Sequence, residues 1–168
     1  GSPGAAPPEA FAALARAITG YAMPYGADLV MDAVRETLRS IFDAPEAAVY
    51  LVATGTAANA LALATMCAPY ETVFCSPTAH IHEDECNAPE FYTAGAKLSI
   101  VGTLDQMTPE TLRSSIEAQQ TRGVHGPQRG PVSITQVTER GAVHSLAQIK
   151  ALSDVAKSYG WLLHTSQP

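Results

Sequence analysis

The chain has 168 residues, of which 46% are hydrophobic and 15% are charged, and its formal net charge is −6. This length and composition predict one folded domain with a substantial core, and they exclude a disordered or low-complexity protein. The ten Lys and Arg residues are scattered along the chain, which excludes a nucleic-acid or anionic-membrane surface, because such surfaces need clustered positive charge.

The first part of the chain is predicted to be helical. Three prolines in residues 3–8 indicate an extended leader, and the apolar spacing that follows favours a short amphipathic helix over Glu9–Ile18. A second helix is predicted over Leu29–Phe42, with Asp28 in the N-cap position and Tyr25 in the loop before it. We expect residues 1–25 to form an N-terminal arm and residues 26–168 an α/β core.

The stretch Tyr50–Leu63 is predicted to join a strand to a helix, and the rest of the chain is organised around it. Ala48–Ala53 is an apolar and β-branched run that is typical of a buried strand. The Ala- and Leu-rich run from Ala57 to about Cys67 favours a helix. A short polar turn must therefore connect the two.

Thr54, Gly55 and Thr56 form this turn, and they could bind an anion. The first turn of a helix has unpaired N–H groups and the positive end of the helix dipole, so a phosphate there meets donors and a favourable field. Gly55 would let the anion approach the backbone closely. The alternative interpretation is that Thr54 or Thr56 only caps the helix.

Strands alternate with helices in the remaining sequence. Two helices are predicted, Pro109–Gln120 and Leu146–Tyr159, with Thr108 and Ser145 as their N-caps, and Gly123–Pro131 is predicted to be a loop. Further strands are expected at Glu71–Cys75, Lys97–Val101, Val132–Val137 and Trp161–His164. Apolar strands that alternate with helices predict a three-layer α/β/α domain with a mainly parallel sheet.

Polar residues cluster where the predicted strands end. These clusters are Thr54–Thr56, His80–Glu85, Thr138–Arg140 and His164–Gln167. Because ligands bind at the carboxyl ends of the strands in such sheets, we expect the clusters to converge on one site.

His80 is the candidate in these clusters for contact with a planar ligand held by the Thr-Gly-Thr turn. A lone His at a strand end is otherwise a surface or capping residue. A metal cluster of His80, His82 and Glu85 is a further alternative, for which this spacing is a weak signal.

The cysteines and the hydropathy pattern bear on the compartment. Cys67, Cys75 and Cys86 have no CxxC or Cys/His spacing, which indicates free thiols, a reducing compartment and no structural zinc. The sequence has no apolar stretch of about 18 residues and no signal-peptide pattern. We therefore expect a soluble, cytoplasmic protein without a membrane partner and without a bound metal.

Short motifs follow one another from about Ala5 to His164. They are Tyr25-Gly26-x-Asp28, Thr54-Gly55-Thr56-Ala57-Ala58-Asn59, Ala79-His80 with Glu85, Gly95-Ala96-Lys97-Leu98, Leu104 with Thr108-Pro109-Glu110, Thr138-Glu139-x-Gly141 and Leu163-His164. In this order they resemble the amino-terminal part of the threonine aldolases and phenylserine aldolases, which are fold type I pyridoxal-phosphate enzymes. The resemblance implies an aminotransferase-like large domain that is incomplete within these residues.

The resemblance also implies an activity and a cofactor site. Such enzymes use pyridoxal 5′-phosphate to cleave a β-hydroxy amino acid, such as threonine, allo-threonine or phenylserine, to glycine and an aldehyde. Gly55 and Thr56, with Thr54, would hold the cofactor phosphate. His80 would stack on the pyridine ring and help to move the proton of the substrate hydroxyl, and Glu85 would fix the surrounding hydrogen bonds.

The remaining implied positions concern the pocket wall and the subunit interface. Thr138 and Glu139 would line the cofactor pocket. Tyr25 and Asp28 would lie near the interface with a neighbouring chain. The resemblance implies a homo-oligomer, a tetramer built from catalytic dimers.

The chain departs from the family pattern at two functional groups. Ser166 stands where the family has an Asp that pairs with the ring nitrogen, and a neutral hydroxyl cannot keep that nitrogen protonated as a carboxylate does. The family also has a lysine that forms the Schiff base with the cofactor, and we expect this chain to lack it. The three lysines here, Lys97, Lys150 and Lys157, fall on a strand and a helix away from the expected pocket. We therefore expect a truncated or altered-end chain that is inactive alone, in which the strand at Ala48–Ala53 lacks its partners.

Other functions remain open from the sequence. Within the same superfamily, the chain could be a β-eliminating lyase or a decarboxylase. The two missing groups favour a non-catalytic interaction fragment. A metal-dependent hydrolase would use His80, His82 and Glu85.

Overall fold

The structure is a computed structural model, and it describes residues 5–120 and 122–166. The chain forms two compact units, Gly1–Leu51 and Val52–Pro168. The predicted division after residue 25, into an N-terminal arm and an α/β core, stays a prediction. No helix in the described residues is long and apolar enough to cross a membrane.

The first unit consists of two helices, α1 (Pro8–Ala17) and α2 (Leu29–Ile41), close to the predicted ranges. Neither helix contains a buried residue, and the apolar side chains of Phe11 and Leu14 are 64% and 62% exposed. The apolar face of α1 is therefore left uncovered within this unit, whereas Val34 and Leu38 of α2 are half-buried.

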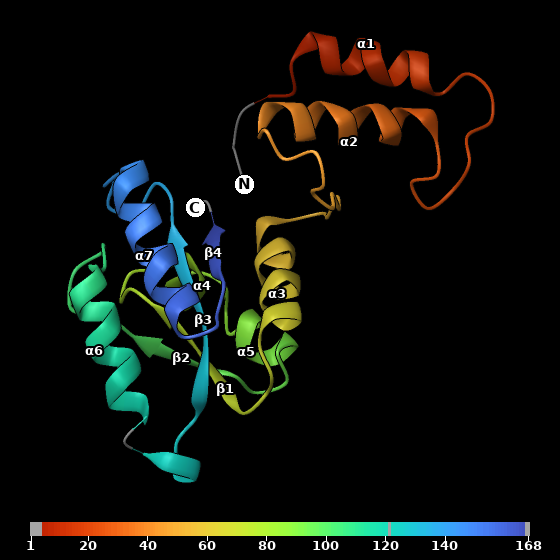
Figure 1. The fold of residues 1–168 in the computed structure, drawn as a ribbon. Coiled ribbons are helices and arrows are strands. Elements are labelled where there is room, and N and C mark those ends of the chain that lie inside the picture. Colours follow the sequence, from red (N-terminus) through yellow and green to blue (C-terminus); the bar gives the residue numbers. More distant parts are fainter. Residues whose placement is uncertain (1–4, 121, 167–168) are drawn as a thin grey trace. The chain divides into compact units, whose positions relative to one another are not determined.

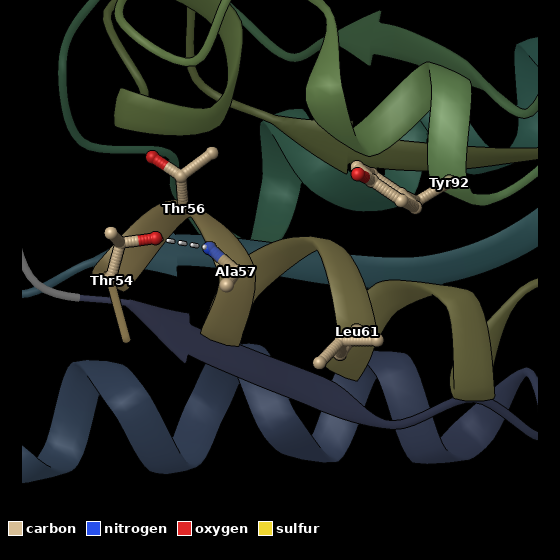
Figure 2. A pocket seen from close by; sticks show the side chains of 5 residues that line it. All are labelled: Thr54, Thr56, Ala57, Leu61 and Tyr92. Carbon is tan, nitrogen blue, oxygen red and sulfur yellow. Dashed lines mark hydrogen bonds between the residues drawn. The ribbon is translucent and has the colours of Figure 1, made fainter. Parts of the chain in front are cut away.

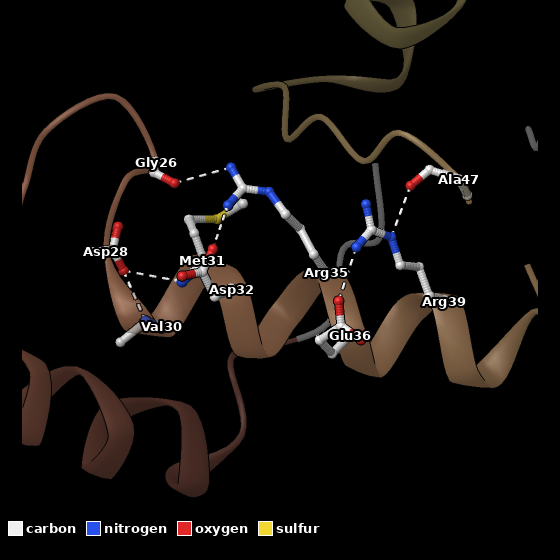
Figure 3. A network of polar contacts seen from close by, with 9 residues as sticks. All are labelled: Gly26, Asp28, Val30, Met31, Asp32, Arg35, Glu36, Arg39 and Ala47. Carbon is white, nitrogen blue, oxygen red and sulfur yellow. Dashed lines mark hydrogen bonds and ion pairs between the residues drawn. The ribbon is translucent and has the colours of Figure 1, made fainter. Parts of the chain in front are cut away.

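Polar contacts fix the ends of α2 (Figure 3). Asp28 Oδ1 accepts hydrogen bonds from the N–H groups of Val30 and Met31, at 2.9 and 3.0 Å, which confirms the predicted N-cap. Arg35 donates to the carbonyl oxygen of Gly26 and Arg39 to that of Ala47, so the flanking loops are held against the helix.

The second unit is a three-layer α/β/α domain, as predicted. Its four described strands are all parallel, in the order β2-β1-β3-β4. The helices α3 and α5 cover one face of the sheet, and α6 and α7 cover the other (Figure 1). The strands are β1 (Glu71–Cys75), β2 (Lys97–Ile100), β3 (Gln128–Thr135) and β4 (Leu163–Ser166), and the helices are α3 (Gly55–Met66), α4 (His80–Glu83), α5 (Ala88–Tyr92), α6 (Pro109–Gln120), the 3-10 helix η1 (Gly123–His125) and α7 (Leu146–Ser158).

Alternating side chains of the strands build two cores. In β1, Phe74 packs with the residues of α6 and α7, whereas Val73 and Cys75 pack with Leu63 of α3 on the opposite face. This period of two is what a strand with both faces covered requires. The chain can bury two cores because helices flank the sheet on both sides.

The predicted strand at Ala48–Ala53 is wrong, because these residues form no strand. Their apolar pattern suits a strand, but a strand also needs a neighbour that pairs with its N–H and C=O groups. The four described strands pair only with one another. The predicted five-strand sheet therefore has four strands in the described part of the chain.

The prediction for β3 was wrong at both ends. The predicted loop at Gly123–Pro131 holds η1 and the first residues of β3, which starts at Gln128 and ends at Thr135. Gly130 explains how a Gly-Pro pair fits inside a strand, since a Cβ atom at this position would collide with the carbonyl oxygen of Thr72 in β1. The close approach coincides with an irregularity in the β1–β3 register.

Candidate functional site

The Thr-Gly-Thr turn is the start of α3. Thr54 is the N-cap, because its Oγ1 accepts the N–H of Ala57 at 3.1 Å, so the capping interpretation is correct for this residue. Gly55 and Thr56 already belong to the helix, and no acceptor among the described residues receives their N–H groups. Gly55 is exposed, and a Cβ atom there would meet nothing within 4 Å. An anion can therefore reach these donors.

A pocket of about 310 Å³ opens beside this turn (Figure 2). Thr54, Thr56 and Ala57 line it at the start of α3, Leu61 lies farther along the same helix, and Tyr92 comes from α5. The pocket is thus lined by the two threonines of the turn together with apolar and aromatic side chains, as in many small-ligand sites.

His80 lies at the carboxyl end of β1, where α4 begins. Its backbone N–H donates to Thr135 Oγ1 at the end of β3, at 3.4 Å. Its ring Nδ1 is 2.9 Å from Glu139 Oε1, and its Nε2 is 3.7 Å from Glu85 Oε1. The structure thus brings together three of the predicted site residues, His80, Glu85 and Glu139.

Glu85 is only 3% exposed, and one of its oxygens has no partner. Asn59 Nδ2 donates to Oε1 at 2.6 Å, whereas Oε2 receives no hydrogen bond in the described structure. Burial raises the pKa of the Glu85 carboxyl, and the hydrogen bond from Asn59 and the nearby His80 oppose this rise.

Asn59 connects the turn to His80, and sequence reasoning did not single it out. It lies three residues after Thr56 in α3, so the two side chains project from one side of the helix. The sequence signal that could have identified Asn59 is its polar side chain within an Ala- and Leu-rich helix. A polar side chain that is buried in such a helix needs a hydrogen-bond partner. Asn59 and Glu85 therefore link the candidate anion site to the imidazole.

Thr138 is buried and anchors the turn that carries Glu139. Its Oγ1 donates to Asp105 Oδ2 at 2.7 Å and accepts the N–H of Ala142 at 2.9 Å. The N–H of Gly141 donates to the Thr138 carbonyl at 2.8 Å, and Gly141 has a φ of 83°, which favours glycine. Sequence reasoning also missed Asp105, although it is a polar residue shortly after a strand.

Ser166 lies at the end of β4, on the face of the sheet covered by α3. It pairs with Thr135 in the β3–β4 register, so both side chains project to the same face. Its Oγ is buried and has no hydrogen-bond partner among the described residues. This hydroxyl is free to donate to a ligand. Gln167, which belongs to the same predicted cluster, lies outside the described residues.

His164 lies two residues before Ser166 and projects to the same face. Its Nδ1 is 2.9 Å from Ser133 Oγ, and burial lowers its pKa to about 4. It is therefore neutral at pH 7.

Tyr25 and Asp28 belong to the first unit. Tyr25 is fully exposed, and the Asp28 carboxylate is used as the cap of α2. Their expected position at a subunit interface stays a prediction.

The structure changes the composition of the possible metal cluster. Ligand atoms of His80, Asp84 and Glu139 lie within 4.8 Å of one another and could surround a cation. The predicted partner His82 instead lies 3.5 Å from its neighbour Glu83. Glu85 Oε1 lies near His80 Nε2, but His82 does not join them in a group of ligand atoms, so the predicted set of His80, His82 and Glu85 is not assembled in the described structure.

Comparison with known proteins agrees with the motifs and the fold. A family model described as beta-eliminating lyase matches residues 5–165. Low specificity L-threonine aldolases from Pseudomonas aeruginosa and from another Pseudomonas strain are 39% and 38% identical over 158 residues, 94% of this chain. The chain spans 45% of the length of each of these relatives.

Among solved structures, a threonine aldolase from Leishmania major matches with a TM-score of 0.86 at 22% identity, over 94% of this chain and 45% of that one. This match confirms the predicted α/β/α fold. Because the family model covers nearly all of the described residues, the chain belongs to the beta-eliminating lyase family, as its resemblance to the threonine aldolases indicated.

Proposed function

We propose that this chain provides part of the active site of a pyridoxal-phosphate-dependent aldolase, which cleaves β-hydroxy amino acids to glycine and an aldehyde. The candidate substrates are threonine, allo-threonine and phenylserine. The observation that carries the proposal is the link from the open start of α3 to His80, through Asn59 and Glu85. The identity of 39% to a low specificity L-threonine aldolase supports the choice of reaction.

The residues at the start of α3 fit a cofactor phosphate. The free N–H groups of Gly55 and Thr56 would donate to its oxygens, where the helix dipole adds a favourable field. The Thr54 hydroxyl accepts a hydrogen bond as a cap, and its own hydrogen stays free to donate.

The groups around the sheet edge fit the cofactor ring. His80 would stack on the ring, and the turn of Thr138 and Glu139 would line its pocket. The unpartnered Ser166 hydroxyl would donate to the ring nitrogen. A hydroxyl there leaves that nitrogen less protonated than a carboxylate would.

When bound, pyridoxal phosphate supplies a sink for the electrons of the broken Cα–Cβ bond. The residues of this chain would bind and orient it and handle the proton of the substrate hydroxyl. His80 would take this proton, because its imidazole is the nitrogen base that lies beside Glu139 and Glu85 at the site.

We propose further that residues 1–168 alone do not catalyse the reaction. Lys97 is the first residue of β2, at the amino end of that strand, whereas His80 follows the carboxyl end of β1. Lys150 is exposed and pairs with Asp154 at 2.6 Å, and Lys157 lies in the last turn of α7, which covers the other face of the sheet from α3. None of the three is placed to bind the cofactor covalently.

A homo-oligomer, a dimer or tetramer, is part of the same proposal, with Tyr25 and Asp28 at the interface. The exposed apolar side chains of α1 and α2 support it, because helices of a soluble protein usually cover such faces.

Binding of a cofactor analogue to the 168-residue chain tests the phosphate site. We expect 4-deoxypyridoxine 5′-phosphate to bind and pyridoxine, which lacks the phosphate, to bind much more weakly in calorimetric titrations. Thr54→Val should weaken binding of the phosphate compound about tenfold or more, because it removes the hydroxyl that would donate to the phosphate, and a hydrogen bond to a charged group contributes about 1.5–3 kcal/mol. Thr65→Val, at the exposed end of α3, is the matched control. Equal binding of the two compounds would overturn the proposal.

Borohydride reduction in the presence of pyridoxal phosphate tests the statement about the lysines. We expect no covalent label on any of the three lysines in the intact mass. Label on one of them would contradict the proposal. The reaction type is tested on a protein that contains this chain together with a cofactor-binding lysine, where an aldehyde product indicates aldol cleavage and a keto acid with ammonia indicates β-elimination.

The non-catalytic interaction fragment gains no support from the turn itself. A distorted Thr54–Thr56 turn would favour that alternative. The turn is instead a regular capped helix start, with Thr54 at φ −143° and ψ 159°.

A further inference from the structure

We propose that Glu139 is a positioning residue that keeps the His80 proton on Nδ1. Nε2 is then the nitrogen with a free lone pair, and it is the atom that takes the proton from the substrate hydroxyl. The assignment of the two nitrogens follows from the structure, and the statement about the substrate rests on the proposed function.

The contact between His80 and Glu139 sets the tautomer. The distance from Nδ1 to Glu139 Oε1 is 2.9 Å, which is a hydrogen bond. A carboxylate can only accept, so Nδ1 must donate. A neutral imidazole carries one N–H, and Nε2 is therefore left without a proton.

The surroundings of Nε2 agree with this assignment. Glu85 Oε1 is 3.7 Å away, which is too far for a hydrogen bond. The hydrogen bond that this oxygen accepts comes instead from Asn59 Nδ2, at 2.6 Å. Nε2 is thus free to accept a proton, while the buried carboxyl stays close enough to interact with an imidazolium.

Both partners of the 2.9 Å contact are held by the end of β3. The His80 backbone N–H donates to Thr135 Oγ1, the last residue of that strand. Glu139 follows Thr138, whose side chain is fixed by Asp105 Oδ2 at 2.7 Å and by the N–H of Ala142. The geometry that pairs the imidazole with Glu139 is therefore built into the sheet edge.

Asp84 is the other carboxylate near Nδ1, and it is the weaker candidate. Its Oδ2 is 3.9 Å from Nδ1, and its side chain is 59% exposed, compared with 25% for Glu139. A more exposed and more distant carboxylate interacts more weakly with the ring. Asp84 is therefore a matched control for Glu139.

The proton step balances without a further reactant. The substrate O–H bond breaks, an N–H bond forms at Nε2, and the products are an alkoxide and an imidazolium. The imidazolium then lies between Glu139, which is 2.9 Å from Nδ1, and Glu85, which is 3.7 Å from Nε2.

Nitrogen NMR of the histidine-labelled 168-residue chain tests the tautomer directly. At about pH 8, well above the ordinary histidine pKa of about 6.5, we expect the His80 ring to show its proton on Nδ1. The His80 signals are identified by their loss in His80→Asn. A proton on Nε2 in the unmodified chain would overturn the proposal, whatever the variants do.

Two alanine variants then identify the group responsible. Glu139→Ala should remove the Nδ1–H pattern and shift His80 toward the Nε2–H tautomer, whereas Asp84→Ala should leave the pattern unchanged. A shift in Asp84→Ala, or none in a folded Glu139→Ala, would contradict the role of Glu139. No cofactor is needed for this experiment, so its failure can be told apart from a failure to bind the phosphate analogue.

Discussion

The hydrogen bond between Asn59 and Glu85 can be removed by one substitution, Asn59→Ala. The bond joins two buried side chains, which are 6% and 3% exposed, over 2.6 Å. Because Glu85 Oε2 already lacks a partner, the substitution leaves both carboxyl oxygens without a hydrogen bond. A charged group buried in this way is costly.

The expected loss can be worked out from general magnitudes. A hydrogen bond to a charged group contributes about 1.5–3 kcal/mol. The higher helix propensity of alanine offsets at most about 0.7 kcal/mol of this. We therefore expect Asn59→Ala to lower the free energy of unfolding by roughly 1–2.5 kcal/mol at pH 7, measured by urea unfolding followed by circular dichroism.

The dependence of this loss on pH provides a second check. The folded pKa of Glu85 is raised above 4.5, so its contribution to stability is complete below that pH and is lost as the pH rises through the folded pKa. Removing Asn59 removes an interaction that lowers this pKa, so the variant should lose more stability at pH 7 than at pH 4.5.

The same loss at both pH values, or a loss below about 0.5 kcal/mol, would refute the reasoning. Thr65→Ala, at an exposed position of the same helix, should change stability by no more than about 0.5 kcal/mol and serves as the control.

Three further predictions concern stability. Phe74→Ala should lower the free energy of unfolding in urea by about 3–5 kcal/mol, because Phe74 is 1% exposed in the larger core, and a loss below about 1 kcal/mol would contradict that packing. Gly130→Ala should lower the melting temperature, since its Cβ would meet the Thr72 carbonyl, and an unchanged melting temperature would argue against the β1–β3 contact. The folded His164 pKa of about 4 lies below 6.5, so its stabilisation is complete above pH 6.5 and is lost toward pH 4, by up to about 3 kcal/mol. His164→Gln should flatten the stability profile across this window, and an unchanged slope would contradict the assignment.

The helices and their ends could be predicted from the sequence because their signals are local. Asp28 and Ser145 cap helices that begin at the next residue, as predicted. The capping box of Ser145 and Gln148 lies within four residues, so nothing distant is needed to form it. The strand Glu71–Cys75 also has the predicted bounds, since a short β-branched and apolar run ends in polar residues there.

Strand pairing could not be predicted with the same success, because apolar character does not show whether a partner exists. Ala48–Ala53 has the composition of a strand and no ladder, whereas Gln128–Thr135 contains Gly130 and Pro131 and is a strand. In β3 the decisive fact is the close approach to Thr72. Only the sheet determines where that approach occurs.

The sequence by itself determined the fold class, and it singled out the Thr-Gly-Thr turn and His80 as candidate site residues. Only the tertiary structure decided which side chains meet at the site. Asn59 reaches Glu85 across 26 positions, Thr138 reaches Asp105 across 33, and His80 reaches Glu139 across 59. Such contacts depend on the order and register of parallel strands, which bring their carboxyl ends to one edge, and no local pattern in the chain encodes those distances.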